Sequence, residues 1–174
     1  MPSAISSYLY GPLTRFGLLV AASTAVADQA VKLWLLRGVG LTEHVPVRLG
    51  PFIDLQLEWN TGISFSLFHQ TGPLGQWALL GVKIIAVVLL WVWLAHAGAR
   101  LTALALGLII GGAIGNAIDR VLHGAVVDFV LFHITTATWT FRWYVFNLAD
   151  AAIVAGVVGL LYESTLARDA AKAP

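Results

Sequence analysis

Four long apolar stretches, at residues 13–36, 74–94, 101–118 and 143–162, dominate the sequence. A helix needs about 20 mostly apolar residues to cross the hydrocarbon core of a bilayer, and each stretch meets that length. The pattern therefore predicts a membrane α-helical fold, a four-transmembrane-helix bundle forming one integral-membrane domain over residues 1–174. An even number of spans places both termini on one side of the membrane.

The first stretch has an alternative interpretation. Arg15 precedes an apolar run that ends in Ala25-Val26-Ala27, and this arrangement resembles a signal peptide with its cleavage site. The apolar character resumes at residues 30–36, however, and cleavage would leave three spans. The pattern favours an uncleaved first helix.

A different pattern fills the loop between the first two stretches. Apolar and polar residues alternate over residues 53–59 and again over 63–67, which is typical of half-buried strands. Asn60-Thr61-Gly62 between them suits a three-residue turn. We expect a small β-hairpin or cradle over residues 53–67 that lies at the membrane interface. Residues 133–143, rich in Thr and Trp, predict a second interfacial segment.

Composition agrees with a protein solvated mainly by lipid. Hydrophobic residues make up 59% of the chain and charged residues 11%, against about 25% charged in soluble domains. The seven tryptophans favour membrane interfaces. A net charge of +1 gives no reason to expect a nucleic-acid partner, and the absence of cysteine excludes disulfides, thiolate metal sites and a cysteine nucleophile.

Charge does not orient the four spans. The side that holds the termini carries Arg15, Arg100, Arg168 and Lys172, and the opposite side carries Arg37, Arg48, Arg120 and Arg142. Cytoplasmic loops normally hold the excess of positive residues, but here the two counts are equal. The histidines also show no metal-ligand spacing, and we expect no metal and no cofactor; they are His44, His69, His96, His123 and His133.

Small and polar residues share the third stretch. Gly107, Gly111 and Gly115 recur at four-residue spacing, which lets helices approach closely. The spacing of Asn116, Asp119 and Arg120 then brings their side chains to one face near the helix end. Asp119 and Arg120 fit an ion pair at the helix end as well as an active role.

Other charges have simpler explanations. Asp28 and Lys32 lie four residues apart on one helix face, so a neutralised pair with the lysine extending to the interface is favoured, although Asp28 could support a site. Lys83 stands alone in the second stretch, where extension to the interface or pairing is expected.

Asp128 and Asp150 are the strongest candidates for chemistry. Asp128 lies among β-branched and aromatic residues, and Asp150 shares a helix face with Asn147, three residues before it. An aspartate in the middle of a bilayer costs roughly 2.5 kcal/mol or more, so membrane carboxylates are usually functional. Two adjacent carboxylates can share one proton, so that the ionised one activates water and the protonated one donates to a peptide carbonyl. Spacing alone leaves open whether these two meet.

Five short motifs, in order along almost the whole chain, resemble the lipoprotein signal peptidase family, signal peptidase II. They are DQAVK at residues 28–32, NTGISF at 60–65, GNAIDR at 115–120, VVDF at 126–129 and FNLAD at 146–150. Ser64 stands where the family pattern leads us to expect alanine. The resemblance implies an intramembrane aspartyl protease, a hydrolase with Asp128 and Asp150 as the catalytic pair. It also implies supporting or substrate-binding positions at Asn60, Asn116, Asp119, Arg120, Asn147 and Asp28.

The resemblance further implies a substrate and a location. The substrates would be diacylglyceryl-modified prolipoproteins, cut just before the lipid-modified cysteine, and the inhibitor globomycin would bind the same site. The enzyme would work as a monomer among the lipids of the bacterial cytoplasmic (inner) membrane, with cytoplasmic termini and the site at the extracytoplasmic face.

Two other functions fit the residues alone. A small proton-coupled transporter could pass protons between Asp28, Asp119 and Asp150. A non-enzymatic subunit of a membrane assembly could use residues 107–115 as its interface.

Overall fold

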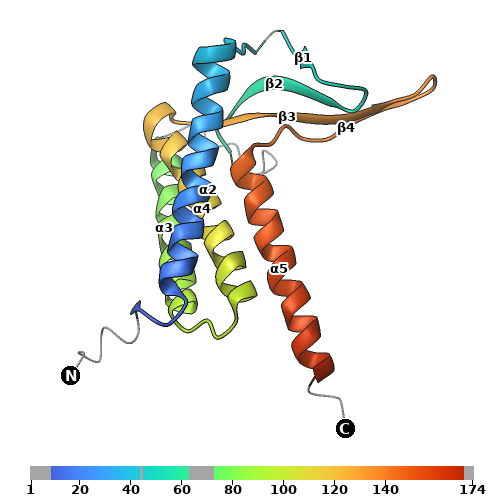
Figure 1. The fold of residues 1–174 in the computed structure, drawn as a ribbon. Coiled ribbons are helices and arrows are strands. Elements are labelled where there is room, and N and C mark those ends of the chain that lie inside the picture. The colour runs from blue at the N-terminus through green and yellow to red at the C-terminus, as the bar shows by residue number, and fades with distance from the viewer. Residues whose placement is uncertain (1–8, 44, 63–72, 171–174) are drawn as a thin grey trace.

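The structure, a computed structural model, describes residues 9–43, 45–62 and 73–170, with side chains left aside at 73–80 and 166–170. Helices stand together at one end of the molecule and a sheet lies across the other end (Figure 1). The helices are α2 (Thr14–Leu33), continuing as the π-helical η1 (Trp34–Val39), α3 (Pro73–Ala95), α4 (Arg100–His123) and α5 (Leu148–Ala170). The strands are β1 (Val47–Arg48), β2 (Ile53–Asn60), β3 (Val126–Thr135) and β4 (Thr140–Arg142).

Three helices of the described chain are long and apolar enough to cross a membrane: Thr14–Val39, Arg100–His123 and Leu148–Thr165. A shorter apolar segment, Gly81–Ala95, belongs to α3. The chain thus has three to four apolar helices, as expected of a multi-pass membrane protein. The first helix continues without a break through residues 25–27, the alternative cleavage site.

Two predicted helix boundaries were wrong. The third helix extends past residue 118 to His123, so Asn116, Asp119 and Arg120 lie within it. Gly124, at φ 71°, ends this helix with a left-handed residue. The fourth helix begins at Leu148 instead of residue 143, which leaves Asn147 just before the helix and residues 143–147 largely outside regular structure.

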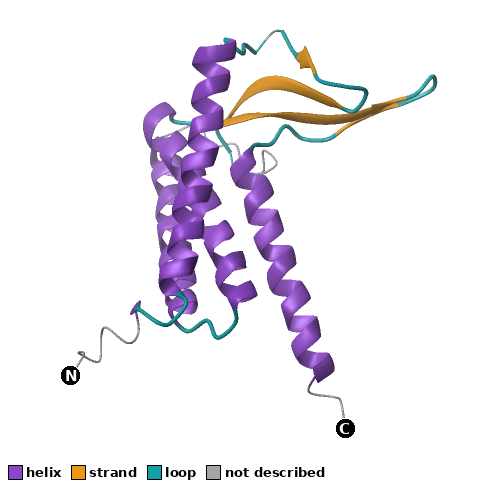
Figure 2. Cartoon of the chain, in the orientation of Figure 1, coloured by secondary structure: helices purple, strands orange, loops and turns teal. Residues whose placement is uncertain are grey.

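The strands form one antiparallel sheet in the order β1-β2-β3-β4 (Figure 2). The strand predicted at residues 53–59 is confirmed, but it pairs with β1 and β3. The second strand predicted at 63–67 lies outside the described residues. The segment at 133–143 forms the β3–β4 turn and parts of both strands. Its prediction missed the strands because Thr and Trp suit interfaces and strands alike.

Glycines allow the helices to approach closely, as their spacing predicted. A Cβ added to Gly107 would lie 2.6 Å from the carbonyl oxygen of Gly17, and one on Gly111 would lie 2.5 Å from that of Ala21. The backbones of α2 and α4 therefore meet directly. A core cluster packs beside this contact and consists of Ala21, Leu94, Ala97, Ala103, Leu106 and Ile110.

Apolar side chains also cover the outward faces of the helices. Val26, Val82 and Leu161 each expose more than 60% of their surface, which suits contact with lipid. A second core cluster joins η1 to the sheet and comprises Leu35, Leu41, Leu57, Val127 and Phe129.

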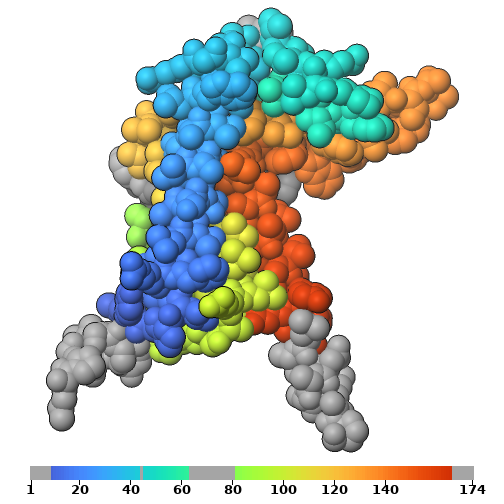
Figure 3. All heavy atoms as spheres, viewed as in Figure 1, coloured from blue at the N-terminus to red at the C-terminus, as the bar shows by residue number. Residues whose placement is uncertain are grey.

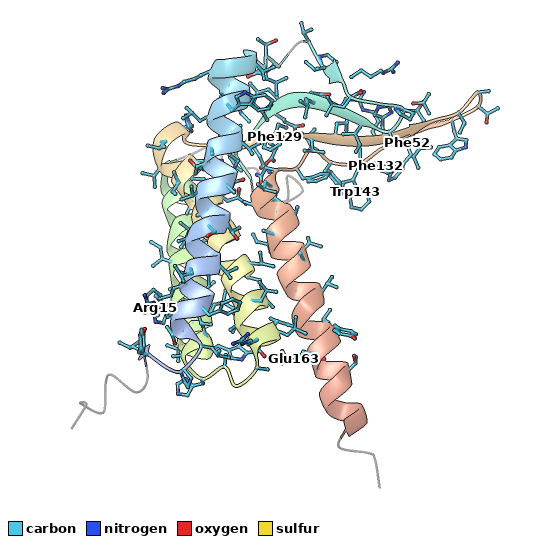
Figure 4. The ribbon with its side chains drawn as sticks, in the orientation of Figure 1. Arg15, Phe52, Phe129, Phe132, Trp143 and Glu163 are labelled. Atoms are coloured by element: carbon cyan, nitrogen blue, oxygen red, sulfur yellow. The ribbon has the colours of Figure 1, made fainter. Side chains whose placement is uncertain are left out.

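The space-filling view shows the sheet extending sideways beyond the helices (Figure 3). Phe132 and Trp143 lie on its lower side, while Arg15 and Glu163 mark the other end of the helices (Figure 4). The residues described below lie where the sheet meets α2, α4 and α5.

Candidate active site

The first turn of α5 is closed by a reciprocal pair of hydrogen bonds. The Asn147 side-chain oxygen accepts from the backbone N–H of Asp150 at 2.9 Å, and the Asp150 carboxylate accepts from the backbone N–H of Asn147 at 3.2 Å. This is a capping box, in which two otherwise unpaired donors of a helix start are satisfied by side chains. The box fixes Asp150 in the first turn, half-buried at the sheet.

Asp128 comes from β3 and is 2% exposed. Its carboxylate accepts hydrogen bonds from the side-chain amides of Asn147 at 2.6 Å and Asn60 at 3.0 Å. Asn60 reaches it from the paired strand β2. Both donors are neutral amides, so they orient the carboxylate without adding a positive charge.

The pKa of Asp128 is raised from 3.8 to about 7, mainly by burial and next by the nearby Asp150 carboxylate. The hydrogen bonds from Asn60 and Asn147 act in the opposite direction because they favour the ionised form. The two aspartates that spacing could not connect are therefore electrostatically coupled, with Asn147 bonded to both.

A third asparagine extends this network into α4. The Asn116 side-chain amide donates to Asp150 at 2.8 Å, and its oxygen accepts from the amide of Asn147 at 3.0 Å. Asn116 is 4% exposed and Asn147 is fully buried. Three asparagines from β2, α4 and the start of α5 thus hold the two carboxylates.

Behind Asn116 lies a buried ionic cluster made of Asp28, Lys32 and Asp119. The Lys32 ammonium lies 2.7 Å from a carboxylate oxygen of each aspartate and 3.4 Å from the side-chain oxygen of Asn116. The predicted Asp28–Lys32 pairing is confirmed. The prediction that Lys32 extends to the interface was wrong, since this side chain is only 3% exposed.

The same two carboxylates bind backbone amides. Asp28 accepts from the N–H of Ala149 at 2.9 Å, and Asp119 accepts from the N–H of Val127 at 3.1 Å. Gln29 adds a donor to Asp119 at 2.8 Å. Each carboxylate therefore fixes the residue that immediately precedes Asp150 or Asp128.

Arg120 does not form the end-of-helix ion pair with Asp119 that was one of the two alternatives for these residues. It donates to the carbonyl oxygens of Gly62 at 2.7 Å and Asn116 at 3.3 Å. Asp119 instead uses Lys32, because the lysine of the neighbouring helix can reach inside the bundle. Arg120 thereby fastens the chain after Asn60 to α4.

Lys83 of α3 interacts electrostatically with Asp128, Asp150, Arg120 and Lys32. The sequence left open whether Lys83 extends to the interface or pairs, and these interactions place it near the two aspartates. His123 ends α4 with its ring 5.4 Å from that of Trp59.

Two cavities of different character meet at Asp128 and Asn60. The first, of about 180 Å³, is mainly polar and is lined by Gln56, Glu58, Asn60, Asp128, Leu131, Arg142, Trp143, Tyr144 and Val145. The second, of about 600 Å³, is mainly apolar and is lined by Asn60, Asp128, Trp143, Val145, Phe146, Asp150, Ala151, Ile153, Val154 and Ala155. Both aspartates therefore border a space large enough for side chains of a bound peptide.

All eight predicted site residues belong to one connected region. Sequence reasoning missed Lys32 as the centre of the ionic cluster, and it missed Gln29 altogether. The signal was present, because two adjacent polar residues, Asp28 and Gln29, interrupt an apolar helix. Within the described part of the chain, no group of three or more His, Cys, Asp or Glu side chains is arranged to hold a metal ion.

Comparison with known proteins gives a consistent result. The family described as Signal peptidase (SPase) II matches residues 20–166. A lipoprotein signal peptidase of Nitrobacter hamburgensis is 57% identical over 160 residues, covering 92% of this chain and 98% of that protein. One from Methylorubrum extorquens is 54% identical, covering 92% of this chain and 90% of that protein.

A solved bacterial membrane enzyme has the same fold, with a TM-score of 0.68 at 24% identity over 85% of this chain and 91% of its own. A second such structure also gives a TM-score of 0.68, at 23% identity over 91% and 92% of the two chains. The family match over residues 20–166 includes every residue of the aspartate network. By these matches, the chain belongs to the signal peptidase II family.

Proposed function

We propose that this protein is an aspartic endopeptidase that removes signal peptides from diacylglyceryl-modified prolipoproteins by cutting before the lipid-modified cysteine. Asp128 and Asp150 are its catalytic residues. The observation that carries this proposal is their arrangement: two coupled carboxylates, held by neutral amides, at the meeting point of a polar and an apolar cavity. Family membership supports the class of substrate.

The chemistry follows from one shared proton. The raised pKa of Asp128 lets this residue hold the shared proton near neutral pH. Asp150 removes a proton from the attacking water, and Asp128 donates its own to the carbonyl oxygen of the scissile peptide bond. As the tetrahedral intermediate collapses, Asp150 passes the proton taken from water to the leaving nitrogen, and Asp128 regains its proton from a hydroxyl of the intermediate. Because water is the nucleophile, no covalent enzyme intermediate forms.

The two cavities divide the work. The polar cavity admits water from the side of the sheet, and the apolar cavity along α5 receives the signal peptide and lipid. Asn60, Asn116 and Asn147 orient the carboxylates, and Arg120 holds the chain at Gly62 beside them. Asp28 and Asp119 support the site through the backbone N–H groups of Ala149 and Val127, which precede the two aspartates.

The location follows from the same arrangement. We place four spans, including α3, in the bacterial cytoplasmic membrane as one domain, with cytoplasmic termini. The start of α2 and the end of α5 lie at the same end of the molecule, away from the sheet (Figure 1). The sheet and the aspartates then lie at the extracytoplasmic face, where a lipid-anchored cysteine fixes the depth of the scissile bond. The protein works as a monomer among membrane lipids.

A proton-coupled transporter is not favoured. Asp28 and Asp119 are fully buried and bound to Lys32 and to backbone amides. Carboxylates committed in this way hold structure in place and are poorly suited to exchange protons along a path.

The test uses purified protein in detergent, a diacylglyceryl-modified prolipoprotein and its unmodified twin. The parent should cleave the modified substrate just before the cysteine, and Asp128→Asn and Asp150→Asn should each reduce turnover by roughly 10⁴-fold or more. Glu43→Gln, which removes a charge at an exposed loop position, is the matched control. Full cleavage by either site variant would refute the assignment of the dyad.

A further inference from the structure

Lys32 is connected to both aspartates of the site by three separate routes. Through Asp28 it reaches the N–H of Ala149, next to Asp150. Through Asp119 it reaches the N–H of Val127, next to Asp128. A third route runs through Asn116, whose amide donates to Asp150.

The burial of this lysine needs explanation. An unpaired charge in a low-dielectric interior is very unfavourable, and lysines near membranes usually extend their ammonium to water. Here the three ammonium hydrogens have three acceptors, on Asp28, Asp119 and Asn116. A simple neutralised pair would need only one acceptor, so the second carboxylate and the amide indicate a further role.

Geometry gives that role. Asp128 stands on a strand and Asp150 on a helix, and 21 intervening residues include the β3–β4 turn, so local structure does not fix their separation. The cluster ties the first residues of both elements to one cation on α2. Gly115 leaves room for this, because a Cβ there would lie 2.6 Å from a carboxylate oxygen of Asp28.

We propose that Lys32 is a positioning residue that sets the relative placement of the Asp128 and Asp150 carboxylates, through Asp28, Asp119 and Asn116. This inference rests on the proposed function, since it assumes that these aspartates carry the chemistry. The hydrogen bonds and ion pairs of Lys32 go to Asp28, Asp119 and Asn116, and not to Asp128 or Asp150. Lys32 therefore acts on the reaction through these three partners.

Its charge also reaches the site. Lys32 favours the ionised form of Asp128, against burial and the charge of Asp150. The other charged groups around Asp128 are Glu58 opposite it on β2, Lys83 of α3, Arg120 of α4 and Asp150 of α5. Removing Lys32 therefore raises the pKa of the proton donor Asp128 and moves the alkaline limb of the pH–rate profile to higher pH, an effect that loss of packing alone would not produce.

The experiment measures kcat, KM and the pH profile of kcat for Lys32→Met, Lys32→Arg and the double variant Lys32→Met/Asp119→Asn. The double variant removes one charge of each sign, so the net charge of the cluster is unchanged and residue 119 still offers an oxygen to Val127. Arg37→Met, an exposed cation on the same helix, is the matched control.

We expect kcat to fall roughly tenfold to hundredfold in the Met variants, with KM changed less than about threefold and the alkaline limb moved to higher pH. Lys32→Arg should restore the pH profile and part of the rate. A folded double variant with parental kcat and pH profile would overturn the proposal. So would failure of the double variant to fold, because Lys32 would then serve the fold alone.

Failure of this inference can be distinguished from failure of the proposed function. Active Asp128→Asn or Asp150→Asn enzymes would remove the dyad and the inference with it. Inactive dyad variants together with unaffected Lys32 variants would overturn the inference alone.

Discussion

Replacing Asp128 with asparagine should abolish cleavage and yet stabilise the protein at neutral and alkaline pH. The folded protein holds the Asp128 proton with a pKa of about 7, against 3.8 for an ordinary aspartate. The side chain is 2% exposed, so solvent screens it little. Keeping this carboxylate ionised in the folded state therefore costs about 4 kcal/mol at pH above 7.

The sign follows from linkage. Because the folded state binds the proton more tightly than the unfolded chain, stability from this group is greatest below about pH 4 and is lost as the pH rises to about 7. Asparagine stays neutral throughout, but its amide N–H₂ faces one of the two donors, Asn60 or Asn147, and loses about 1–2 kcal/mol. A net gain of about 2–3 kcal/mol remains at pH 8, equal to roughly 4–12 °C in Tm.

The assay is thermal unfolding in detergent from pH 4 to pH 8. As the pH rises, the Tm of the parent should fall below that of Asp128→Asn. Asp150→Asn should reduce the pH dependence of the parent in part, because it removes the second cause of the raised pKa. The exposed Glu43→Gln should follow the parent. Parallel curves for Asp128→Asn and the parent, or a lower Tm for the variant at pH 8, would refute the reasoning.

Three further outcomes are expected. Asn147→Ala removes a 2.6 Å hydrogen bond to Asp128, so kcat should fall roughly tenfold to hundredfold and the alkaline limb of its pH profile should move to higher pH; an unmoved limb would contradict this. Gly115→Ala should lower both Tm and kcat because its methyl group meets the Asp28 carboxylate at 2.6 Å, whereas Gly81→Ala, with nothing within 4 Å, should keep parental values of both. Turnover should be unchanged by a chelator, because the proposed chemistry uses two carboxylates and water; inhibition reversed by added metal would show otherwise.

Much of the fold could be predicted because lipid imposes simple rules. The apolar runs located the helices, the glycine spacing located the contact of α2 with α4, and alternation located β2. The errors occurred where tertiary contacts override hydropathy. Asn116 and Asp119 lower the apolar character of the third run, and yet the helix continues because Lys32, Asn147 and Val127 satisfy their side chains.

The residues of the site were largely predictable, but their connections were not. The period and spacing of residues describe one helix or strand at a time. The pairing of β2 with β3, in contrast, brings together Asn60 and Asp128, which are 68 residues apart in the sequence. Because the fourth helix was predicted to begin at residue 143, Asn147 was placed inside the helix, and its capping box with Asp150 was not recognised. Its signal, Asn followed three residues later by Asp before an apolar run, was present but was interpreted as a helix face.

The order of charges and amides in the site explains how two carboxylates can share a proton in this setting. A lysine or arginine bonded directly to Asp128 or Asp150 would favour two ionised groups, and no proton would remain for the peptide carbonyl. The structure places neutral amides from Asn60, Asn116 and Asn147 against the pair. The Lys32 charge stands one residue further away, where it orients Asn116 and acts weakly on Asp128. Rigid placement and a shared proton are therefore compatible, because the cation holds the partners of the dyad instead of the dyad itself.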